Sequence, residues 1–490
     1  MKQLTFDFNN MFSHNVGTEH GVTEADLKQI IPQADRAAEH IRAIISDERN
    51  RISLGLEWAK LPYQDISCVE YIQNFGDEVA SSCENVISLG IGGSYLGLKA
   101  AQDALVWPYY NEFANLRNGR PRIYFDGNNL DPDTLSTLLK NLNPKKTFVV
   151  VISKSGETTE TKAAFTVVED WLKKGAGKGY GRQVFAITDP KSGALRKKVN
   201  AEQAKDPLCF RNLPVINGVG GRFSELNIGL LHLAIIGVKI QGVLDGAKGI
   251  AERCSTKGVF DNPALMYAVM NTILCRAKGK NIAVMMPFCE TLKSTAEWYV
   301  QLLAESLGKK FARKIELFKD GSEVWHPDAK VLNCGRTPVP ARGTGDLHSI
   351  QQNNIEGENN KVVTFVRVEK FRDDIKIGKD NDTLSGQSYA KLMLLAQEAT
   401  EWALVRESRP SCAITMPEVS PRHWGELLFF FEMATAYEGE LLNVNAYDQP
   451  GVEGYKNYLY YKLGKTGIPP DISESILTNP LKKDKRYIIA

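Results

Sequence analysis

Short β-branched and apolar runs alternate with helix-like segments through most of this chain, and no other feature limits its fold so strongly. The runs lie at residues 85–90, 122–127, 147–156 and 184–189 and, in a second series, at 281–288, 361–368 and 412–417. Most of them are apolar on both faces, which is typical of parallel strands that helices cover on both sides. The alternation therefore predicts an α/β protein with two doubly wound parallel-sheet domains.

A chain of 490 residues is too long for one ordinary hydrophobic core, so more than one domain is expected. We expect four parts: a helical N-terminal segment over 1–80, a first sheet domain over 81–250, a second over 265–430 and a helical C-terminal segment over 431–490. Long helical stretches are expected around 224–245 and over 420–464.

The charge balance and the special residues exclude several classes of protein. Lysine and arginine number 60 against 58 for aspartate and glutamate, so no strong field attracts nucleic acid or an anionic membrane. The most apolar stretch, 228–244, is interrupted by His232 and Lys239 and predicts a buried helix rather than a membrane span. No HExxH pattern or cysteine–histidine cluster indicates a metal site, and no cofactor is predicted. Eight cysteines without paired spacing, and a start without a signal-peptide core, favour a cytoplasmic protein.

The stretch VVVISKSGETTET, residues 149–161, passes directly from a predicted strand into hydroxyl side chains. Ligands of open α/β sheets bind beyond the carboxyl ends of the strands. A helix beginning near Glu157 would add free amide groups and a positive dipole end, which together with the hydroxyls predict a phosphate site. The alternative is that the hydroxyls only cap the helix.

A glycine-rich turn, GIGGSYLG at 90–97, follows the first predicted strand. It lacks the dinucleotide spacing, because the third glycine of GxGxxG would fall at Tyr95. Gly92, Gly93 and Ser94 nevertheless lie at a neighbouring strand end, where they would let a ligand approach the backbone. The alternative is a tight turn without a ligand.

These features together resemble the SIS-type sugar-phosphate isomerase domains, and four blocks narrow the resemblance to the glucose-6-phosphate isomerase family. The blocks are GVGGRFSELNIG at 218–229, QLLAESLGKK at 301–310, GTGDLHSIQQ at 343–352 and GELLNVNAYDQPGVEGYK at 439–456. The resemblance implies reversible isomerisation of D-glucose 6-phosphate to D-fructose 6-phosphate, through ring opening and a cis-enediol(ate), in glycolysis and gluconeogenesis. It also implies that no metal or organic cofactor takes part.

Glu305 is the candidate base. A helix over roughly 292–307 would place Trp298, Gln301 and Glu305 on one face, and Gly308 would end it. Judged alone, such a glutamate is more often a solvated surface residue. The resemblance implies that Glu305 transfers the proton and that Gln301 contacts substrate, although this block reads ESLG where many relatives have ESNG.

Arg222 follows two glycines, which permit an unusual backbone before a permanently charged guanidinium. One alternative is a structural pair between Arg222 and Glu225 at a helix start. The resemblance implies instead that Arg222 stabilises the enediolate oxygens and that Gly221 contacts substrate.

His348 follows the flexible turn 343–345, and judged alone it would be a surface histidine. The resemblance implies that His348 assists ring opening from the neighbouring subunit, so the active unit would be a homodimer. It also makes Lys456 a ring-opening lysine and Gln449 a substrate contact. For Lys456 the alternative is an i,i+3 pair with Glu453 on a solvated helix face.

The resemblance also assigns the hydroxyl-rich segment. Its phosphate ligands would be Ser94, Ser153, Ser155 and Thr158, and nearby substrate contacts would be Gly93, Lys154 and Thr161. The form SKSGET resembles the bacterial branch rather than the bulkier SKTFTT of animal relatives, which leaves the roles of Gly156 and Glu157 open.

Three rival functions remain from the sequence. A related isomerase that also accepts mannose 6-phosphate is typically shorter and lacks the full pair of long signatures. An amino-sugar isomerase of the synthase type needs a cysteine directly after the initiator methionine, where this chain has Lys2. A non-catalytic sugar-phosphate sensor usually carries a DNA-binding module, and no basic helix-turn-helix is visible.

Overall fold

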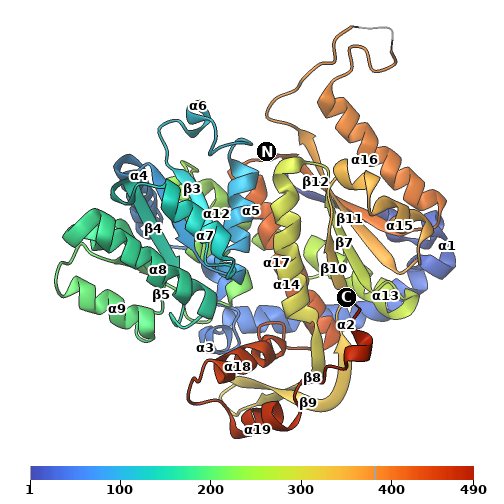
Figure 1. Ribbon diagram of the computed structural model, residues 1–490. Helices are drawn as coiled ribbons and strands as arrows, with labels where there is room; N and C mark the ends of the chain where they lie inside the picture. The colour runs from blue at the N-terminus through green and yellow to red at the C-terminus, as the bar shows by residue number, and fades with distance from the viewer. Residues whose placement is uncertain (1, 380–381, 490) are drawn as a thin grey trace. The chain divides into compact units, whose positions relative to one another are not determined.

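The computed structural model describes residues 2–379 and 382–489. Within these residues the strands form two sheets of five strands each and one separate hairpin (Figure 1). Helices cover both faces of the sheets, so the predicted fold class, two doubly wound parallel-sheet domains with helical terminal segments, is confirmed.

The first sheet is parallel throughout and has the order β3-β2-β4-β5-β6. Its strands are β2 (Asn85–Leu89), β3 (Arg122–Asp126), β4 (Thr147–Ile152), β5 (Val184–Thr188) and β6 (Arg211–Pro214). The first four follow the predicted runs. The edge strand β6 was not predicted, because RNLP is short, polar and ends in proline, which is tolerated at a sheet edge.

The second sheet has the order β1-β12-β11-β7-β10. Its strands are β1 (Thr5–Asp7), β7 (Ile282–Pro287), β10 (Thr337–Pro340), β11 (Lys361–Lys370) and β12 (Ser411–Glu418). The three central strands are parallel and follow the predicted runs, whereas β1 pairs antiparallel with β12. Both edge strands, β1 and β10, were missed because they are short and lack an apolar run.

The N-terminal segment is helical, as predicted. Its helices are α1 (Ser13–His20), α2 (Glu24–Ser46), α3 (Glu48–Ser53) and α4 (Ile66–Ser82). The start of α2 is fixed by a capping box, in which Thr23 accepts from the amide of Asp26 (3.1 Å) and Asp26 accepts from the amide of Thr23 (2.9 Å).

The remaining helices pack around and between the sheets. Those that follow the first strands are α5 (Leu96–Leu105), α6 (Ala114–Arg117), α7 (Pro132–Asn141), α8 (Thr159–Ala176) and α9 (Ala194–Gln203). Those of the second half are α13 (Pro263–Lys278), α14 (Lys293–Leu307), α15 (Gln351–Glu356), α16 (Tyr389–Arg406) and α17 (Pro421–Leu442). Helices α14 and α17 lie between the two sheets (Figure 1), and α17 is buried along almost its whole length.

Two segments predicted to be helical each contain more than one helix. The stretch expected around 224–245 is divided into α10 (Glu225–Ile228), α11 (Leu230–Ile235) and α12 (Ile240–Cys254). Gly237, with φ of 88°, turns the chain between α11 and α12. In the segment expected over 420–464, α17 ends at Leu442 because Asn443 adopts the left-handed conformation with φ of 55°, and a second helix follows over Glu453–Lys462.

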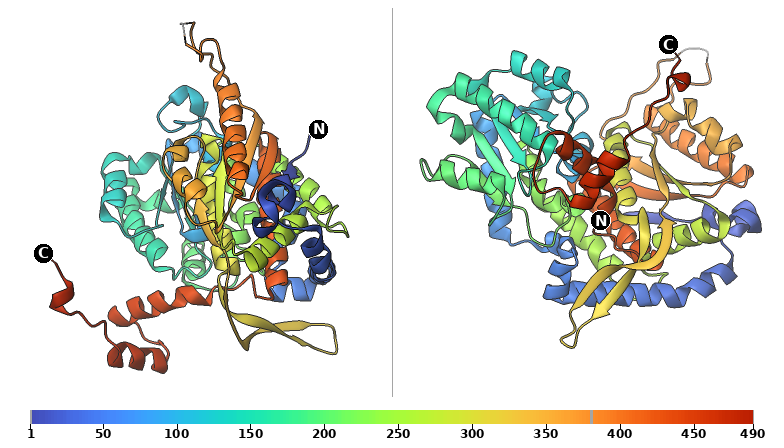
Figure 2. Two further views of the ribbon diagram at one scale, coloured as in Figure 1. Left: turned by 90° about the vertical axis from the view of Figure 1, so that its right-hand side faces the viewer. Right: turned by 60° about the horizontal axis from the view of Figure 1, so that its bottom comes forward.

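A long antiparallel hairpin, β8 (Lys309–Leu317) and β9 (Glu323–Cys334), was not predicted. It projects from the body of the molecule, as the left view of Figure 2 shows. Most of its side chains are at least partly exposed, so its sequence lacks the apolar run by which the buried strands were predicted.

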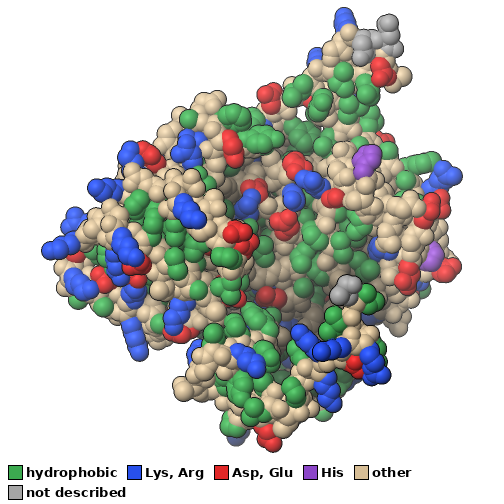
Figure 3. Space-filling model, viewed as in Figure 1, with side chains coloured by type: hydrophobic (Ala, Val, Ile, Leu, Met, Phe, Trp, Pro, Cys, Tyr) green, Lys and Arg blue, Asp and Glu red, His purple; other side chains and the backbone are tan. Residues whose placement is uncertain are grey.

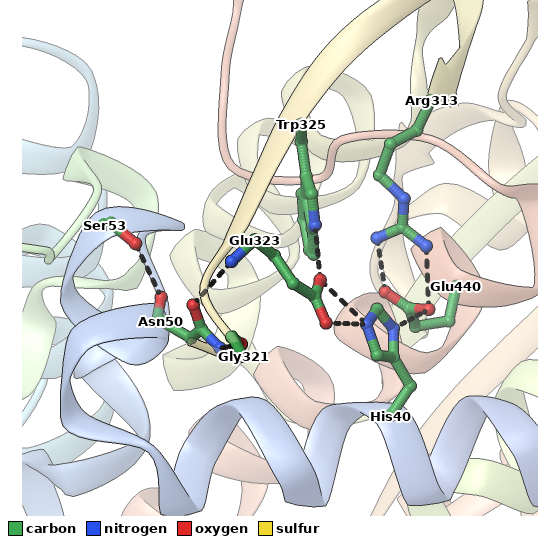
Figure 4. Close-up of polar contacts among 8 residues, drawn as sticks. All are labelled: His40, Asn50, Ser53, Arg313, Gly321, Glu323, Trp325 and Glu440. Atoms are coloured by element: carbon green, nitrogen blue, oxygen red, sulfur yellow. Dashed lines mark hydrogen bonds and ion pairs between the residues drawn. The ribbon is translucent and has the colours of Figure 1, made fainter. Parts of the chain in front are cut away.

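The hairpin is anchored near its turn by a cluster around His40 of α2 (Figure 4). One ring nitrogen of His40 lies 2.8 Å from a carboxylate oxygen of Glu440, and the other lies 3.1 Å from Glu323 of β9. Arg313 of β8 donates two hydrogen bonds to Glu440, at 2.5 and 2.8 Å. Burial opposes the charge of His40, but its bonds to the two glutamates outweigh burial and raise the pKa of His40.

The chain divides into two compact units, Met1–Tyr447 and Asp448–Ala490. The second unit contains α18 (Glu453–Lys462) and α19 (Pro470–Thr478). The domain limits expected from the sequence stay a prediction. None of the described helices is both long and apolar enough to cross a membrane. Basic and acidic side chains are interspersed on the face seen in Figure 3, in keeping with the nearly balanced charge.

Candidate functional site

The hydroxyl-rich segment forms a closed loop between β4 and α8. The hydroxyl of Ser153 accepts from the amide of Gly156 (3.0 Å), and that of Ser155 accepts from the amide of Glu157 (3.1 Å). A hydroxyl that accepts an amide can still donate its own proton. Both serines therefore keep a donor that a ligand could use.

Helix α8 begins at Thr159, two residues later than expected, with Thr158 as its N-cap. The side chain of Thr158 makes no capping hydrogen bond. The alternative that the hydroxyls only cap the helix therefore does not describe Thr158. Lys154 is exposed beside it, whereas Thr161 is buried and its hydroxyl donates to the carbonyl of Gly127 (3.3 Å).

The glycine turn after β2 lies at the same edge of the sheet, because β2 and β4 are neighbouring parallel strands. A β-carbon on Gly93 would lie only 1.8 Å from the carbonyl oxygen of Gly221, and one on Gly92 would lie 2.9 Å from Nε2 of Gln301. The two glycines therefore allow three segments to meet closely. Half-buried Ser94 ends this turn, the 3-10 turn η3 (Gly92–Ser94).

Arg222 lies in the 3-10 turn η6 (Gly221–Phe223) and is buried. Its guanidinium donates to Oγ of Ser306 (2.8 Å), to Oε2 of Glu305 (3.2 Å) and to the carbonyl of Ala446 (2.6 Å). The unusual backbone expected before Arg222 is not found, since Gly220 has an ordinary φ of −79°. The turn instead requires glycine at residue 93, because the backbone of Gly93 packs directly against the carbonyl oxygen of Gly221.

Glu305 lies in the last turn of α14, which ends at Leu307 as predicted. Gln301, one turn earlier, donates to Oε1 of Glu305 (3.2 Å), while Arg222 donates to Oε2. The carboxylate is thus held from both sides, yet the side chain of Glu305 is 29% exposed. The structure brings together five predicted residues: Gly93, Gly221, Arg222, Gln301 and Glu305.

His348 is not joined to this group within the chain. It ends the 3-10 turn η8 (Gly345–His348), beyond β10, and is exposed. In the described part of the chain, no hydrogen bond or ion pair links it to Glu305 or Arg222.

Lys456 and Gln449 belong to the second compact unit. Lys456 lies in the first turn of α18 and donates to Oε1 of Glu453 (2.8 Å), which is the pairing that the alternative interpretation expects. Burial opposes the charge of Lys456, but this bond outweighs it and raises the pKa of the ammonium group.

The sequence did not indicate the supports of the site. Ser306 and the carbonyl of Ala446 hold the guanidinium of Arg222, and Glu225 accepts from Nε1 of Trp298 (2.7 Å) on α14. These contacts join segments far apart in the chain, so no local pattern could reveal them. Across residues 2–379 and 382–489, no group of three histidine, cysteine, aspartate or glutamate side chains is arranged to hold a metal ion.

Two doubly wound sheets, with polar loops at the carboxyl edge of the first and a buried arginine beside a glutamate, define an α/β protein of the sugar-isomerase (SIS) type. The phosphoglucose isomerase family model matches residues 64–460. The chain belongs to the phosphoglucose isomerase family.

Individual relatives agree with this assignment. The chain is 36% identical to a glucose-6-phosphate isomerase of Carboxydothermus hydrogenoformans, over 99% of each chain. It is 34% identical to that of Rubrobacter xylanophilus, over 95% of this chain and 99% of the relative. Among solved structures, a hypothetical protein of Thermus thermophilus superposes with a TM-score of 0.78 at 30% identity, over 95% of this chain and all of the other. A glucose-6-phosphate isomerase of Chlamydia trachomatis shares the fold, with a TM-score of 0.68 at 22% identity, over 86% of this chain and 80% of the other.

Proposed function

We propose that this chain interconverts D-glucose 6-phosphate and D-fructose 6-phosphate through ring opening and a cis-enediol(ate), with Glu305 as the proton-transfer base. The observation that carries the proposal is the contact of Glu305 with both Gln301 and Arg222 in a chain of the phosphoglucose isomerase family. A base of this kind must be held firmly and must still reach the substrate.

In the proposed reaction Glu305 removes the proton from C2 of the open-chain aldose and returns it to C1. A second proton leaves the hydroxyl at C2 and another reaches the oxygen at C1, so the sugar is isomerised without net loss of atoms. The negative charge develops on the two oxygens during these steps. The guanidinium of Arg222, already 3.2 Å from Glu305, stabilises that charge without having to reorganise.

The phosphate of the substrate binds to hydroxyl and amide donors at the carboxyl edge of the first sheet, namely Ser94, Ser153, Ser155 and Thr158. Lys154 is exposed at the same loop and contributes a positive charge, whereas Thr161 supports the loop through Gly127. Anchoring the phosphate far from C1 and C2 uses binding energy to position the reacting carbons.

Ring opening is assigned to His348, supplied by the neighbouring subunit of a homodimer, and to Lys456 with Gln449. His348 is exposed on its own chain and is therefore accessible to a neighbouring subunit, which supports this assignment. A role in glycolysis and gluconeogenesis in the cytoplasm completes the proposal.

Proton NMR of fructose 6-phosphate in D₂O with the purified protein, with and without EDTA, tests the reaction. We expect glucose 6-phosphate to appear with deuterium at C2, at the same rate in both samples. Conversion with complete retention of hydrogen would contradict an exchanging enediol(ate), and a tritium-exchange measurement would then test for a shielded proton. Binding of the sugar phosphate without conversion would favour the sensor, and conversion of mannose 6-phosphate would favour the broader isomerase.

A further inference from the structure

Two glutamates lie buried against one another behind the Arg222–Glu305 contact. Glu225 is the first residue of α10, three residues after Arg222, and Glu432 lies in the middle of α17. Their exposed fractions are only 3% and 2%. Nε1 of Trp298 donates to Oε1 of Glu225 at 2.7 Å. Because Trp298 and Glu305 are seven residues apart on α14, this bond joins the face that carries the base to the segment that carries Arg222.

The space around Glu225 is filled. A β-carbon on Gly97 of α5 would lie 2.1 Å from Cγ of Glu225, so the side chain fits only because residue 97 is glycine. Glu225 therefore contacts α5 and α14 and faces α17. A change in its position would therefore affect the packing of these helices.

The other buried glutamates of α17 have donors or cations outside the helix. Glu426 accepts from the amide of Leu4 (3.1 Å), Glu438 binds Arg336, and Glu440 binds Arg313. Glu432 differs from them, because in the described part of the chain Glu225 is the one charged group that acts on it. Oε1 of Glu432 and Oε2 of Glu225 also have no hydrogen-bond partner there.

Burying two ionised carboxylates side by side without a cation costs too much free energy. Such a pair therefore retains a proton. Burial raises the pKa of Glu225 to about 7. Burial, with the adjacent charge of Glu225, raises the pKa of Glu432 well above its ordinary value. Besides each other, the main partners of the pair among residues 2–379 and 382–489 are Trp298 from α14 and the backbones of Ser224 and Glu225, none of which carries a charge.

We propose that Glu225 and Glu432 share one proton and act as positioning residues, which hold Trp298 and thereby set the distance between Glu305 and Arg222. This inference rests on the proposed isomerase reaction. While the proton is shared, the pair carries a single charge and Glu225 holds the indole of Trp298. When the proton is lost at high pH, the two carboxylates repel each other, α10 moves relative to α14 and α17, and the 3.2 Å contact in the site loosens.

The test compares the pH profiles of kcat and KM of the full-length protein and of Glu432→Gln. Glutamine has the same shape and donates a permanent N–H toward Glu225. We expect near-normal kcat at pH 7 and an alkaline decline of kcat that moves upward by at least about one pH unit, with KM unchanged. The matched control is Glu426→Gln, a buried glutamate of the same helix with its own donor, whose profile should coincide with that of the unmodified protein.

Two further variants test the roles of Glu225 and Trp298. Glu225→Gln should also extend the alkaline range, and it replaces Glu432→Gln if that variant does not fold. Trp298→Phe should lower kcat about tenfold at all pH values. A folded Glu432→Gln protein whose alkaline decline coincides with that of the unmodified protein would overturn the shared proton.

If the unmodified protein does not interconvert the two sugar phosphates at pH 7, the proposed function fails. The pair is then tested by thermal unfolding alone, where Glu432→Gln should raise Tm relative to the unmodified protein increasingly as pH rises, because only the native glutamate ionises. A Tm difference that is independent of pH would refute the pair.

Discussion

Two buried arginine–glutamate pairs in this molecule differ in how completely they are satisfied. Arg336 donates to both oxygens of Glu438, at 2.8 and 2.6 Å, and both side chains are 2% exposed. Arg222 is equally buried, but its contact with Glu305 is 3.2 Å long and Glu305 is 29% exposed. We call Arg336–Glu438 the closed pair, because both side chains are buried and joined by two hydrogen bonds, and Arg222–Glu305 the open pair, because its carboxylate is partly exposed.

The difference indicates what each pair is for. A bidentate pair satisfies both charges and fixes both side chains, as expected for a part of the scaffold. In the open pair, the other donors of Arg222 hold Ser306 and a backbone carbonyl, so the arginine is fixed while the carboxylate stays accessible. Rigid positioning of the cation and access to the base are what the proposed proton transfer needs.

Breaking the closed pair should have the largest effect on stability. Arg336→Met would leave Glu438 buried without its cation, which costs about 3–5 kcal/mol in such sites. Urea unfolding followed by circular dichroism measures the loss, and the double variant Arg336→Met/Glu438→Leu should recover most of it. A loss below about 1 kcal/mol would show that the closed pair is not what holds the segment between β9 and β10 against α17.

Breaking the open pair should act on turnover instead. Glu305→Gln keeps the shape and can still accept one of the two hydrogen bonds, from Gln301 or from Arg222, but it removes the base, so kcat should fall at least about 10²-fold, equivalent to about 2.7 kcal/mol. The midpoint of urea unfolding should change little, because Glu305 is partly exposed. Steady-state kinetics give the first number, and near-normal turnover would remove Glu305 from the mechanism.

Replacing Arg222 by lysine tests whether a positive charge alone is enough in the open pair. Arg222→Lys retains the cation but loses the planar fork that reaches Ser306, Glu305 and Ala446 together, so kcat should fall about 10–10²-fold. The matched variant Arg313→Lys acts on a second closed pair, in which Arg313 donates two hydrogen bonds to Glu440, and it should lower the stability and leave kcat nearly unchanged. Equal effects of both variants on kcat would mean that the open pair has no special role.

The sequence predicted the parts of the fold that are buried on both faces. The central strands β2, β4, β7 and β11 appear as mostly apolar runs without a regular polar alternation, because helices cover both sides of them. The edge strands β1, β6 and β10 are short and lack an apolar run, and the hairpin β8–β9 is largely exposed, so none of these gave that signal. The edge strand β3 has an apolar run and was predicted.

The candidate site shows the same limit. The helical period predicted that Trp298, Gln301 and Glu305 share a face of α14, and the structure places them so. The partners of Arg222 and the approach of Gly93 to Gly221 depend on packing between distant segments. Glu432 lies in an otherwise apolar stretch of α17, where a single sequence does not distinguish a buried carboxyl from an exposed one.

The smallest expected effect concerns the second closed pair, Arg313–Glu440, which has a titrating third partner in His40 (Figure 4). The pKa of His40 is raised in the folded protein, so its contribution to stability is complete below pH about 6.5 and is lost as pH rises through the folded value. His40→Asn should therefore cost about 1 kcal/mol more at pH 5.5 than at pH 8.5, measured by urea unfolding. His348→Asn is the control, because this exposed histidine touches no carboxylate in the described part of the chain. If the loss of unfolding free energy in His40→Asn is the same at both pH values, His40 is neutral and Arg313 alone balances the charge of Glu440. The pair Arg313–Glu440 would then need no third charged partner, like Arg336–Glu438.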